Sequence, residues 1–166
     1  KTNIHEILER VRSLILSEFT SDINFIRDYD VSLPEFIVDR EKLIQAILNI
    51  ARNGAQAMKL NNQDNMQLSF ITRAERQIVF RKKKHATAIR IDIIDNGPGI
   101  KNELIDKIFF PLVTGNENGS GLGLSLAQNL ISLHQGMIDC HSVPGKTVFS
   151  IILPIENNLM PTKEKK

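Results

Sequence analysis

The sequence has very little cysteine, no long apolar run and almost no excess charge. Cys140 is the single cysteine among 166 residues, which excludes an internal disulfide framework and is typical of a reducing compartment. No apolar run approaches the roughly 18–20 residues that span a bilayer, and Lys1–Arg10 lacks the pattern of a secretory signal. A formal net charge of +2 is too small to indicate nucleic acid or an anionic membrane as the main partner. We therefore expect a soluble, cytoplasmic domain that binds no nucleic acid and makes no membrane contact.

Several familiar site motifs are each missing a required residue. A P-loop ending at Lys146-Thr147 needs glycine where Cys140 stands, and it should open a helix rather than a strand. The glycine-rich segment Gly119–Leu124 lacks the last glycine of a dinucleotide fingerprint. His5 has no second histidine at position 9, so we interpret it as a polar residue on the exposed side of the first helix. The other histidines lack the spacing of metal ligands.

The periodicity of apolar residues predicts an α+β fold. Helical spacing predicts helices over Asn3–Phe19, Arg40–Leu60 and Leu122–Leu133. Asp39 is the expected N-cap of the second helix, and Gly136 is the expected C-cap of the third. A further short helix is expected over Glu103–Phe109, and strands are expected over Ile23–Tyr29, Phe36–Val38, Met66–Thr72, Gln77–Phe80, Ala88–Ile94, Met137–Ser142 and Thr147–Leu153. This order favours a two-layer sandwich, in which about three helices cover one face of a mixed sheet.

The chain length suits one domain. We expect residues 1–156 to form it and the polar residues 157–166 to be a disordered tail. The sequence starts without methionine and with a helical pattern, and it ends in a polar tail, which is compatible with a fragment of a longer protein.

Two asparagines are the first candidate site residues. Asn49 and Asn53 lie one turn apart on the second predicted helix, and therefore on one face of it. Carboxamides are costly to bury without partners, and their carbonyl oxygens are suitable ligands for Mg²⁺ that keeps waters and phosphate oxygens in its other positions. Simple surface polarity is the alternative, which the interleaved Ile50, Ala51 and Ala55 weaken.

The end of a predicted strand and the glycine-rich segment add two further candidates. Asp95 ends an apolar strand and precedes two glycines, so its carboxylate could accept a hydrogen bond from an exocyclic amine such as that of adenine; a purely local hydrogen bond is the alternative. Glycines at 119, 121 and 123 lead into a helix N-terminus, which suits a phosphate, although a flexible linker is equally compatible. Thr147 starts the terminal strand after a tight turn.

Taken together, four motifs resemble the N, G1, F and G2 boxes of one family in their order along the chain. They are Asn49-x3-Asn53, Asp95-x-Gly97-x-Gly99, Phe109-Phe110-Pro111 and Gly119-x-Gly121-x-Gly123. The chain from about Lys1 to Ile155 thus resembles the catalytic and ATP-binding domain of sensor histidine kinases, in the superfamily of gyrase, Hsp90 and mismatch-repair ATPases. Nitrogen-regulation sensor kinases of the NtrB type are similar in four longer stretches, namely Arg27–Asp30, Gln45–Ile50, Phe110–Gly115 and Ala127–Ile131.

The resemblance implies a Bergerat-type fold, the cofactors ATP and Mg²⁺, and a role for each matching residue. Asn53 would be the principal Mg²⁺ ligand, with Asn49 assisting at metal and phosphates, so both would be catalytic. Asp95 would bind the adenine amine. The other implied ATP-binding residues are Gln56, Gly97, Gly99, Ile100, Thr114, Gly119, Gly121, Leu122, Gly123, Leu124 and Thr147, and Phe110–Ser120 would be a lid over the phosphates.

The chain departs from the family pattern after the second asparagine. Gln56-Ala57 stands where many sensor kinases have Lys-Tyr, which leaves a cationic contact and an aromatic wall at the nucleotide in doubt. Gly54 replaces the commoner alanine, at a cost in helix propensity of up to about 1 kcal/mol unless something packs closely against it.

Asn49 also distinguishes between kinds of chemistry. Hydrolytic members of the superfamily have glutamate there to activate water, and asparagine cannot take that proton. The resemblance implies transfer of the γ-phosphoryl group to a histidine on a separate dimerisation domain, and then to a response regulator, with a PII-type signalling protein as a further partner. The alternatives are a serine kinase of the anti-sigma type and a nucleotide-gated binding module without turnover. The basic run Arg81–Lys84 is most simply a solvated hairpin tip, and partner docking is its alternative function.

Overall fold

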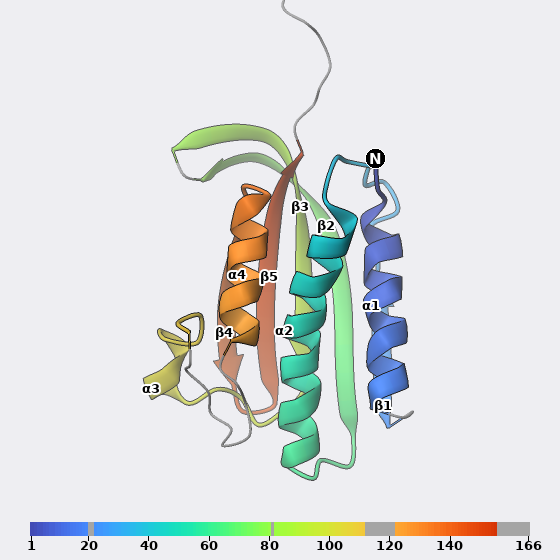
Figure 1. Cartoon of the computed structure of the whole chain (residues 1–166), viewed down its shortest axis with the longest axis vertical. Coiled ribbons are helices and arrows are strands. Elements are labelled where there is room, and N and C mark those ends of the chain that lie inside the picture. The colour runs from blue at the N-terminus through green and yellow to red at the C-terminus, as the bar shows by residue number, and fades with distance from the viewer. Residues whose placement is uncertain (20–21, 81, 112–121, 156–166) are drawn as a thin grey trace, which may run out of the picture.

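One five-stranded sheet carries the main helices on a single face, as the computed structural model shows (Figure 1). The structure describes residues 1–19, 22–80, 82–111 and 122–155. In chain order its elements are α1 (Ile4–Glu18), β1 (Ile23–Asp28), α2 (Arg40–Leu60), β2 (Met66–Phe80), β3 (Lys83–Asp95), α3 (Asn102–Ile105), α4 (Gly123–Leu133), β4 (Met137–Val143) and β5 (Lys146–Ile155). The strand order is β1-β2-β3-β5-β4. Only β1 and β2 pair in parallel; the other neighbours are antiparallel.

The predicted α+β sandwich with a mixed sheet is therefore confirmed. Helices α1, α2 and α4 lie side by side over the sheet, with α2 in the middle (Figure 1). No helix in the described part of the chain is long and apolar enough to cross a membrane. The predicted polar tail at 157–166 lies outside the described residues.

Helix α2 begins and ends where the sequence predicts. The Asp39 side chain accepts a hydrogen bond from the backbone N–H of Lys42 and so caps the first turn. Leu43, Ile47 and Ile50 on its inner face are at most 1% exposed. Since α2 packs on both neighbouring helices and on the sheet, its position determines where the side chains on its remaining face lie.

Some of the predicted strand and helix boundaries are wrong. Met66–Phe80 is one strand rather than two, because the polar residues that interrupt its apolar alternation still pair with β3. The outer part of this β2–β3 hairpin projects from the body as an arm (Figure 1). Phe36–Val38 forms no strand, and Phe36 makes only an isolated bridge with Thr2. The predicted helix over Glu103–Phe109 is reduced to α3.

The prediction of Gly136 as the C-cap of α4 is also wrong. Gln135 takes the left-handed conformation, with φ +58°. Its N–H donates to Ser132 O at 3.0 Å, and the N–H of Gly136 donates to Ile131 O at 3.0 Å, which is the Schellman pattern. A Cβ at Gly136 would lie 2.8 Å from Ile152 O and 2.9 Å from Ile131 Cγ2. Close packing against β5, rather than backbone conformation, therefore requires glycine at this position.

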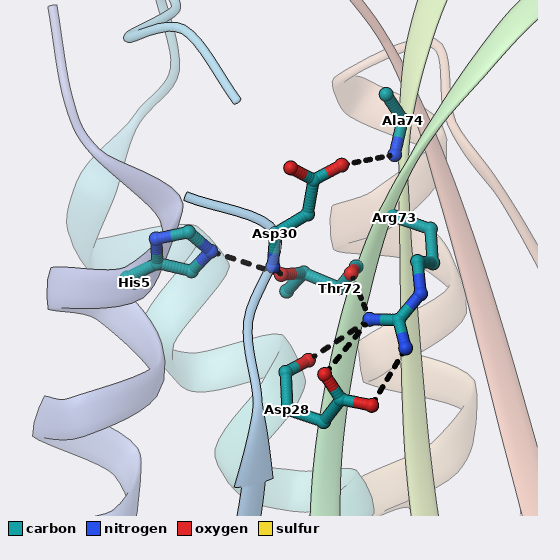
Figure 2. A network of polar contacts seen from close by, with 6 residues as sticks. All are labelled: His5, Asp28, Asp30, Thr72, Arg73 and Ala74. Atoms are coloured by element: carbon teal, nitrogen blue, oxygen red, sulfur yellow. Dashed lines mark hydrogen bonds and ion pairs between the residues drawn. The ribbon is translucent and has the colours of Figure 1, made fainter. Parts of the chain in front are cut away.

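His5 belongs to a polar network that joins α1 to β2, rather than to an exposed helix face as predicted (Figure 2). Its Nε2 lies 2.9 Å from Thr72 Oγ1, and its ring stacks on Tyr29 with centroids 4.6 Å apart. Thr72 is fully buried and also accepts the N–H of Asp30. Burial lowers the pKa of His5, although the carboxylates of Asp30 and Glu9 oppose this effect. The network holds the start of α1 against the sheet.

Gln135→Gly and Gly136→Ala are expected to change stability in opposite directions. Glycine at position 135 relieves the left-handed strain, which contributes roughly 1 kcal/mol. Alanine at position 136 forces a Cβ into β5 and is expected to destabilise by about 1–3 kcal/mol. Urea unfolding of both variants measures the two changes. A neutral Gly136→Ala combined with a destabilising Gln135→Gly would show that Gly136 is the conformational cap after all.

Candidate functional site

Asp95 is a buried carboxylate at the end of β3, on the side of the sheet that faces the helices. It is only 7% exposed, and its Oδ1 accepts the N–H of Gly97 at 2.9 Å. No other hydrogen bond reaches this carboxylate from the described residues. Burial raises the pKa of Asp95, and the hydrogen bond from Gly97 only partly opposes this. The free oxygen of this carboxylate is thus an acceptor in a poorly solvated place.

Two glycines make room for this carboxylate. A Cβ at Gly54 would lie 2.7 Å from Asp95 Oδ2, and a Cβ at Gly97 would lie 2.8 Å from Asp95 Oδ1. Gly54 stands on α2, so the helix backbone itself lies against the acid. This contact explains why glycine replaces the commoner alanine at position 54, which helix propensity alone does not.

The loop after Asp95 is joined to the turn between β4 and β5. The N–H of Gly145 donates to Gly97 O at 2.9 Å, and the N–H of Ile100 donates to Ser142 Oγ at 2.8 Å. Gly99 has φ +86°, and a Cβ there would lie 2.9 Å from Val143 O. The two glycines of the predicted motif therefore serve two needs: space beside Asp95 at Gly97, and a left-handed turn at Gly99.

Thr147 and Ser142 lie beside Asp95 on neighbouring strands. Thr147 is 3% exposed and stands opposite Asp95 in the β3–β5 register. Its Oγ1 is 2.7 Å from the Oγ of Ser142, which stands opposite Thr147 in the β4–β5 register. Ser142 is not among the site residues that the sequence predicts, although the hairpin predicted around Pro144-Gly145 already places it across from Thr147.

Asn96 is another residue that the sequence prediction misses. Its Oδ1 accepts the N–H of Gln67 at 2.8 Å and the amide of Gln63 at 2.9 Å. Its Nδ2 donates to Asn65 O at 2.8 Å. These contacts attach the loop after Asp95 to the turn between α2 and β2, so the segments on both sides of Asp95 are fixed.

Asn49, the first of the two asparagines on α2, lies near the first residue of α4. Asn49 is half-buried, while Asn53 and Gln56 are exposed. A Cβ at Gly123 would lie 4.0 Å from Asn49 Cγ. Within the described ranges, the carboxamides of Asn49 and Asn53 make no hydrogen bond, so their oxygens can serve a ligand.

Helix α4 presents its N-terminus at this place. It starts at Gly123, has no acidic residue in its first turn and receives no side-chain cap from the described residues, so its first N–H groups and the positive end of its dipole suit an anion. Leu122 is 47% exposed, while the half-buried Leu124 packs against the core. The C-terminal half of α2, the start of α4 and the β4–β5 turn all lie towards the end of the molecule opposite the N-terminus (Figure 1).

Part of the predicted site falls outside the described residues. Thr114, Gly119 and Gly121 lie in the range 112–121, which the structure does not describe. The entry to this range is anchored: the ring of Phe109 packs edge-on against Phe149 with centroids 6.2 Å apart. Phe110, the next residue, is 58% exposed. The structure thus brings Thr147 and the Gly97–Ile100 loop to Asp95, and Gly123 to Asn49, and the ligand roles of all these residues stay predictions.

Comparison with known proteins identifies relatives in both sequence and fold. Residues 38–157 match the family described as histidine kinase-, DNA gyrase B-, and HSP90-like ATPase. The chain is 48% identical over 153 residues to the sensory histidine kinase/phosphatase NtrB of Vibrio alginolyticus, covering 92% of this chain and 43% of that protein. The protein of the same name from Salmonella typhimurium is 44% identical over the same shares. The chain therefore spans less than half the length of the curated relatives it matches.

Solved structures agree on the fold. A mycobacterial sensor histidine kinase, MprB, superposes with a TM-score of 0.76 at 21% identity, covering 93% of this chain and 97% of that one. The catalytic domain of histidine kinase ThkA has a TM-score of 0.72 at 24% identity, covering 93% of each chain. At this level of identity the likeness supports the architecture alone.

Asp95→Asn is expected to stabilise the ligand-free protein at neutral pH and to weaken nucleotide binding. The pKa of Asp95 is raised in the folded state. Its contribution to stability is therefore fully present at a pH below the pKa of the unfolded chain, and it is lost as pH rises through the pKa of the folded protein. Asparagine removes this loss and can still accept the N–H of Gly97. Its NH₂ group then faces any incoming amine, so Mg-ATP should bind roughly tenfold to a hundredfold more weakly, since a hydrogen bond to a charged group contributes about 1.5–3 kcal/mol.

Urea unfolding against pH and titration calorimetry measure the two effects. The gain in unfolding free energy should shrink as pH falls towards 3.8, the ordinary pKa of an aspartate. Asp28→Asn is the control with the opposite sign, because the hydrogen bond from Arg73 lowers the pKa of Asp28. A gain that does not depend on pH, or ATP binding equal to that of the wild type, would contradict the role of Asp95.

Proposed function

Because the chain belongs to the histidine kinase-, DNA gyrase B-, and HSP90-like ATPase family, we propose that it is the catalytic and ATP-binding domain of an NtrB-type sensor histidine kinase. One observation carries the proposal: the buried carboxylate of Asp95 lies against Gly54 of α2, and Asn49 of the same helix lies near Gly123, where α4 begins with no side-chain cap from the described residues. Membership of an ATPase family supports ATP as the nucleotide. The similarity to NtrB proteins supports the narrower assignment.

The adenine end of the nucleotide is assigned to Asp95. Its free oxygen accepts the exocyclic amine, and the glycines on either side keep the carboxylate uncovered. Thr147 and the Gly97–Ile100 loop form the neighbouring wall, held in place by the β4–β5 turn. Low exposure strengthens this hydrogen bond, because water competes weakly for the carboxylate.

The phosphate end is assigned to α2 and α4. The oxygens of Asn49 and Asn53 are hard ligands without protein partners among the described residues, which fits Mg²⁺ held by few side chains and by phosphate oxygens. We assign Asn53 as the principal ligand and Asn49 as its helper. When bound, the metal would neutralise charge on the phosphates. The N–H groups of the first turn of α4 would bind the same phosphates.

The proposed reaction is transfer of the γ-phosphoryl group to histidine. The bond between the γ-phosphorus and the bridging oxygen breaks, a phosphorus–nitrogen bond forms on the acceptor imidazole, and ADP leaves. Asn49 cannot accept a proton from water, so position 49 supplies no general base for hydrolysis of ATP. Positioning and charge neutralisation are its contributions. The acceptor histidine belongs to a separate dimerisation domain and passes the phosphoryl group to a response regulator in the cytoplasm.

Mixing the domain with a histidine-bearing dimerisation fragment and γ-labelled ATP tests this function. We expect acid-labile phosphate on the fragment, and its loss by at least about a hundredfold in Asn53→Ala, because metal and phosphate positioning supply most of the rate. Asn129→Ala, an exposed helical asparagine on α4, is the matched control and should transfer normally. Acid-stable product would favour the serine kinase, and ATP binding with no transfer would favour the binding module.

A PII-type signalling protein completes the proposed set of partners, and we assign its contact to the β2–β3 arm. Lys82, Lys83 and Lys84 are exposed at the arm's tip, where a projecting cationic surface can steer an acidic partner. Replacing all three by alanine should weaken PII binding by about tenfold at low salt, because each exposed charge contributes at most about 1 kcal/mol to binding. The same change at Lys101, Lys107 and Lys146, which are equally exposed, is the control. Equal binding by both triple variants would remove the arm from the proposal.

A further inference from the structure

The hydroxyl groups of Ser142 and Thr147 form a short chain of hydrogen bonds that ends beside Asp95. The N–H of Ile100 donates to Ser142 Oγ at 2.8 Å, and Ser142 Oγ lies 2.7 Å from Thr147 Oγ1. Either hydroxyl could be the donor of the second bond. Which one donates decides what Thr147 can offer to a ligand.

The donor at the start of the chain leaves the proton of Ser142 free to continue it. A backbone N–H only donates, so Ser142 accepts from Ile100 and can still donate its own proton. Thr147 Oγ1 lies 2.7 Å from Ser142 Oγ, and a chain that runs in one direction from Ile100 has Ser142 as the donor of this second bond. With Ser142 donating, the hydroxyl proton of Thr147 points away from Ser142. Each bond of such a chain polarises and strengthens the next.

The proton of Thr147 is then available on the Asp95 side. Thr147 and Asp95 are a directly opposed pair in the β3–β5 register, and the side chains of such pairs share a face and lie within about 5.5 Å at their Cβ atoms. An ionised carboxylate only accepts. With the chain in this direction, Asp95 offers an acceptor and Thr147, next to it, offers a donor.

This order matches one purine edge and opposes the other. Adenine has an amino donor at C6 beside an acceptor at N1, whereas guanine has an acceptor at O6 beside a donor at N1. We propose that Ser142 is a positioning residue that fixes the Thr147 hydroxyl as a donor towards N1, and so makes the site selective for adenine over guanine. This inference rests on the adenine pocket proposed above, and it adds to that proposal a residue which does not itself touch the base. Guanine would leave polar groups of the site and of the base unpaired, and this cost is what makes discrimination between the two bases strong.

A matched control is present on the other face of the same sheet. Ser150 on β5 is half-buried and donates to Asp92 Oδ1 at 2.7 Å. Its side chain alternates with that of Phe149, which lies in the core on the helix side. Ser150→Ala removes a comparable hydroxyl and hydrogen bond without touching the pocket.

The test is titration calorimetry of Mg-ATP and of 1-deaza-ATP, which has a C–H group in place of N1. Wild type and Ser150→Ala should bind the deaza compound about fivefold more weakly than ATP, the size expected for one hydrogen bond. Ser142→Ala should bind ATP about fivefold more weakly than wild type and should no longer distinguish the two ligands. Its preference for ATP over GTP should narrow as well. Ser142→Thr keeps the hydroxyl and should restore discrimination.

Comparing two ligands on one variant cancels any loss of folded protein. Full discrimination against 1-deaza-ATP in Ser142→Ala would overturn the inference, even if both ligands bind more weakly. Loss of discrimination in Ser142→Thr or in Ser150→Ala would overturn it too. Failure of the pocket itself has a different signature: wild type that does not bind Mg-ATP, or Asp95→Asn that binds it normally.

Discussion

A carboxylate kept out of water beside a helix backbone is the constraint around which this domain is arranged. Asp95 is 7% exposed and receives one hydrogen bond, from Gly97. Burying a charge so poorly compensated is unfavourable for the empty protein. In the proposed site, the same arrangement would make the carboxylate a strong acceptor for the adenine amine. Binding strength would then be linked to lower stability of the ligand-free domain.

The parts around Asp95 are joined so that the acid cannot relax away. Gly54 on α2 places backbone against one oxygen. Asn96 attaches the start of the following loop to the α2–β2 turn, and Ser142 and Gly145 attach the rest of it to the β4–β5 hairpin. Segments far apart in the sequence therefore hold one loop. These bonds would pre-organise the base end of the proposed site.

How much the sequence could predict differs from element to element. Helix α2 was predictable to the residue because its cap and its apolar stripe are both local features. Strand β2 was not predictable as a single strand. Its polar residues interrupt the apolar alternation, but their pairing with β3 keeps them in the strand. The need for glycine at positions 54 and 136 depends on contacts with Asp95 and β5, which no local pattern contains. In the site, Asn49 lies near Gly123, while the ligand roles of both residues stay predictions. Ser142 was missed as a supporting residue, although the hairpin that the sequence predicts already places it across from Thr147.

An amide NMR titration with Mg-ATP tests the central claim most directly, because it reports on every part of the chain at once. If Asp95 and its supporting loop form the adenine pocket, the largest shifts should occur in three places: Asn49–Gln56 on α2, Gly97–Ile100 beside Asp95, and the Ser142–Thr147 hairpin together with Gly123. The amides of His5 and of Lys82–Lys84 on the arm should stay unchanged. Shifts concentrated on the arm or around His5, with Gly97–Ile100 unaffected, would contradict the claim that Asp95 and its supporting loop form the adenine pocket.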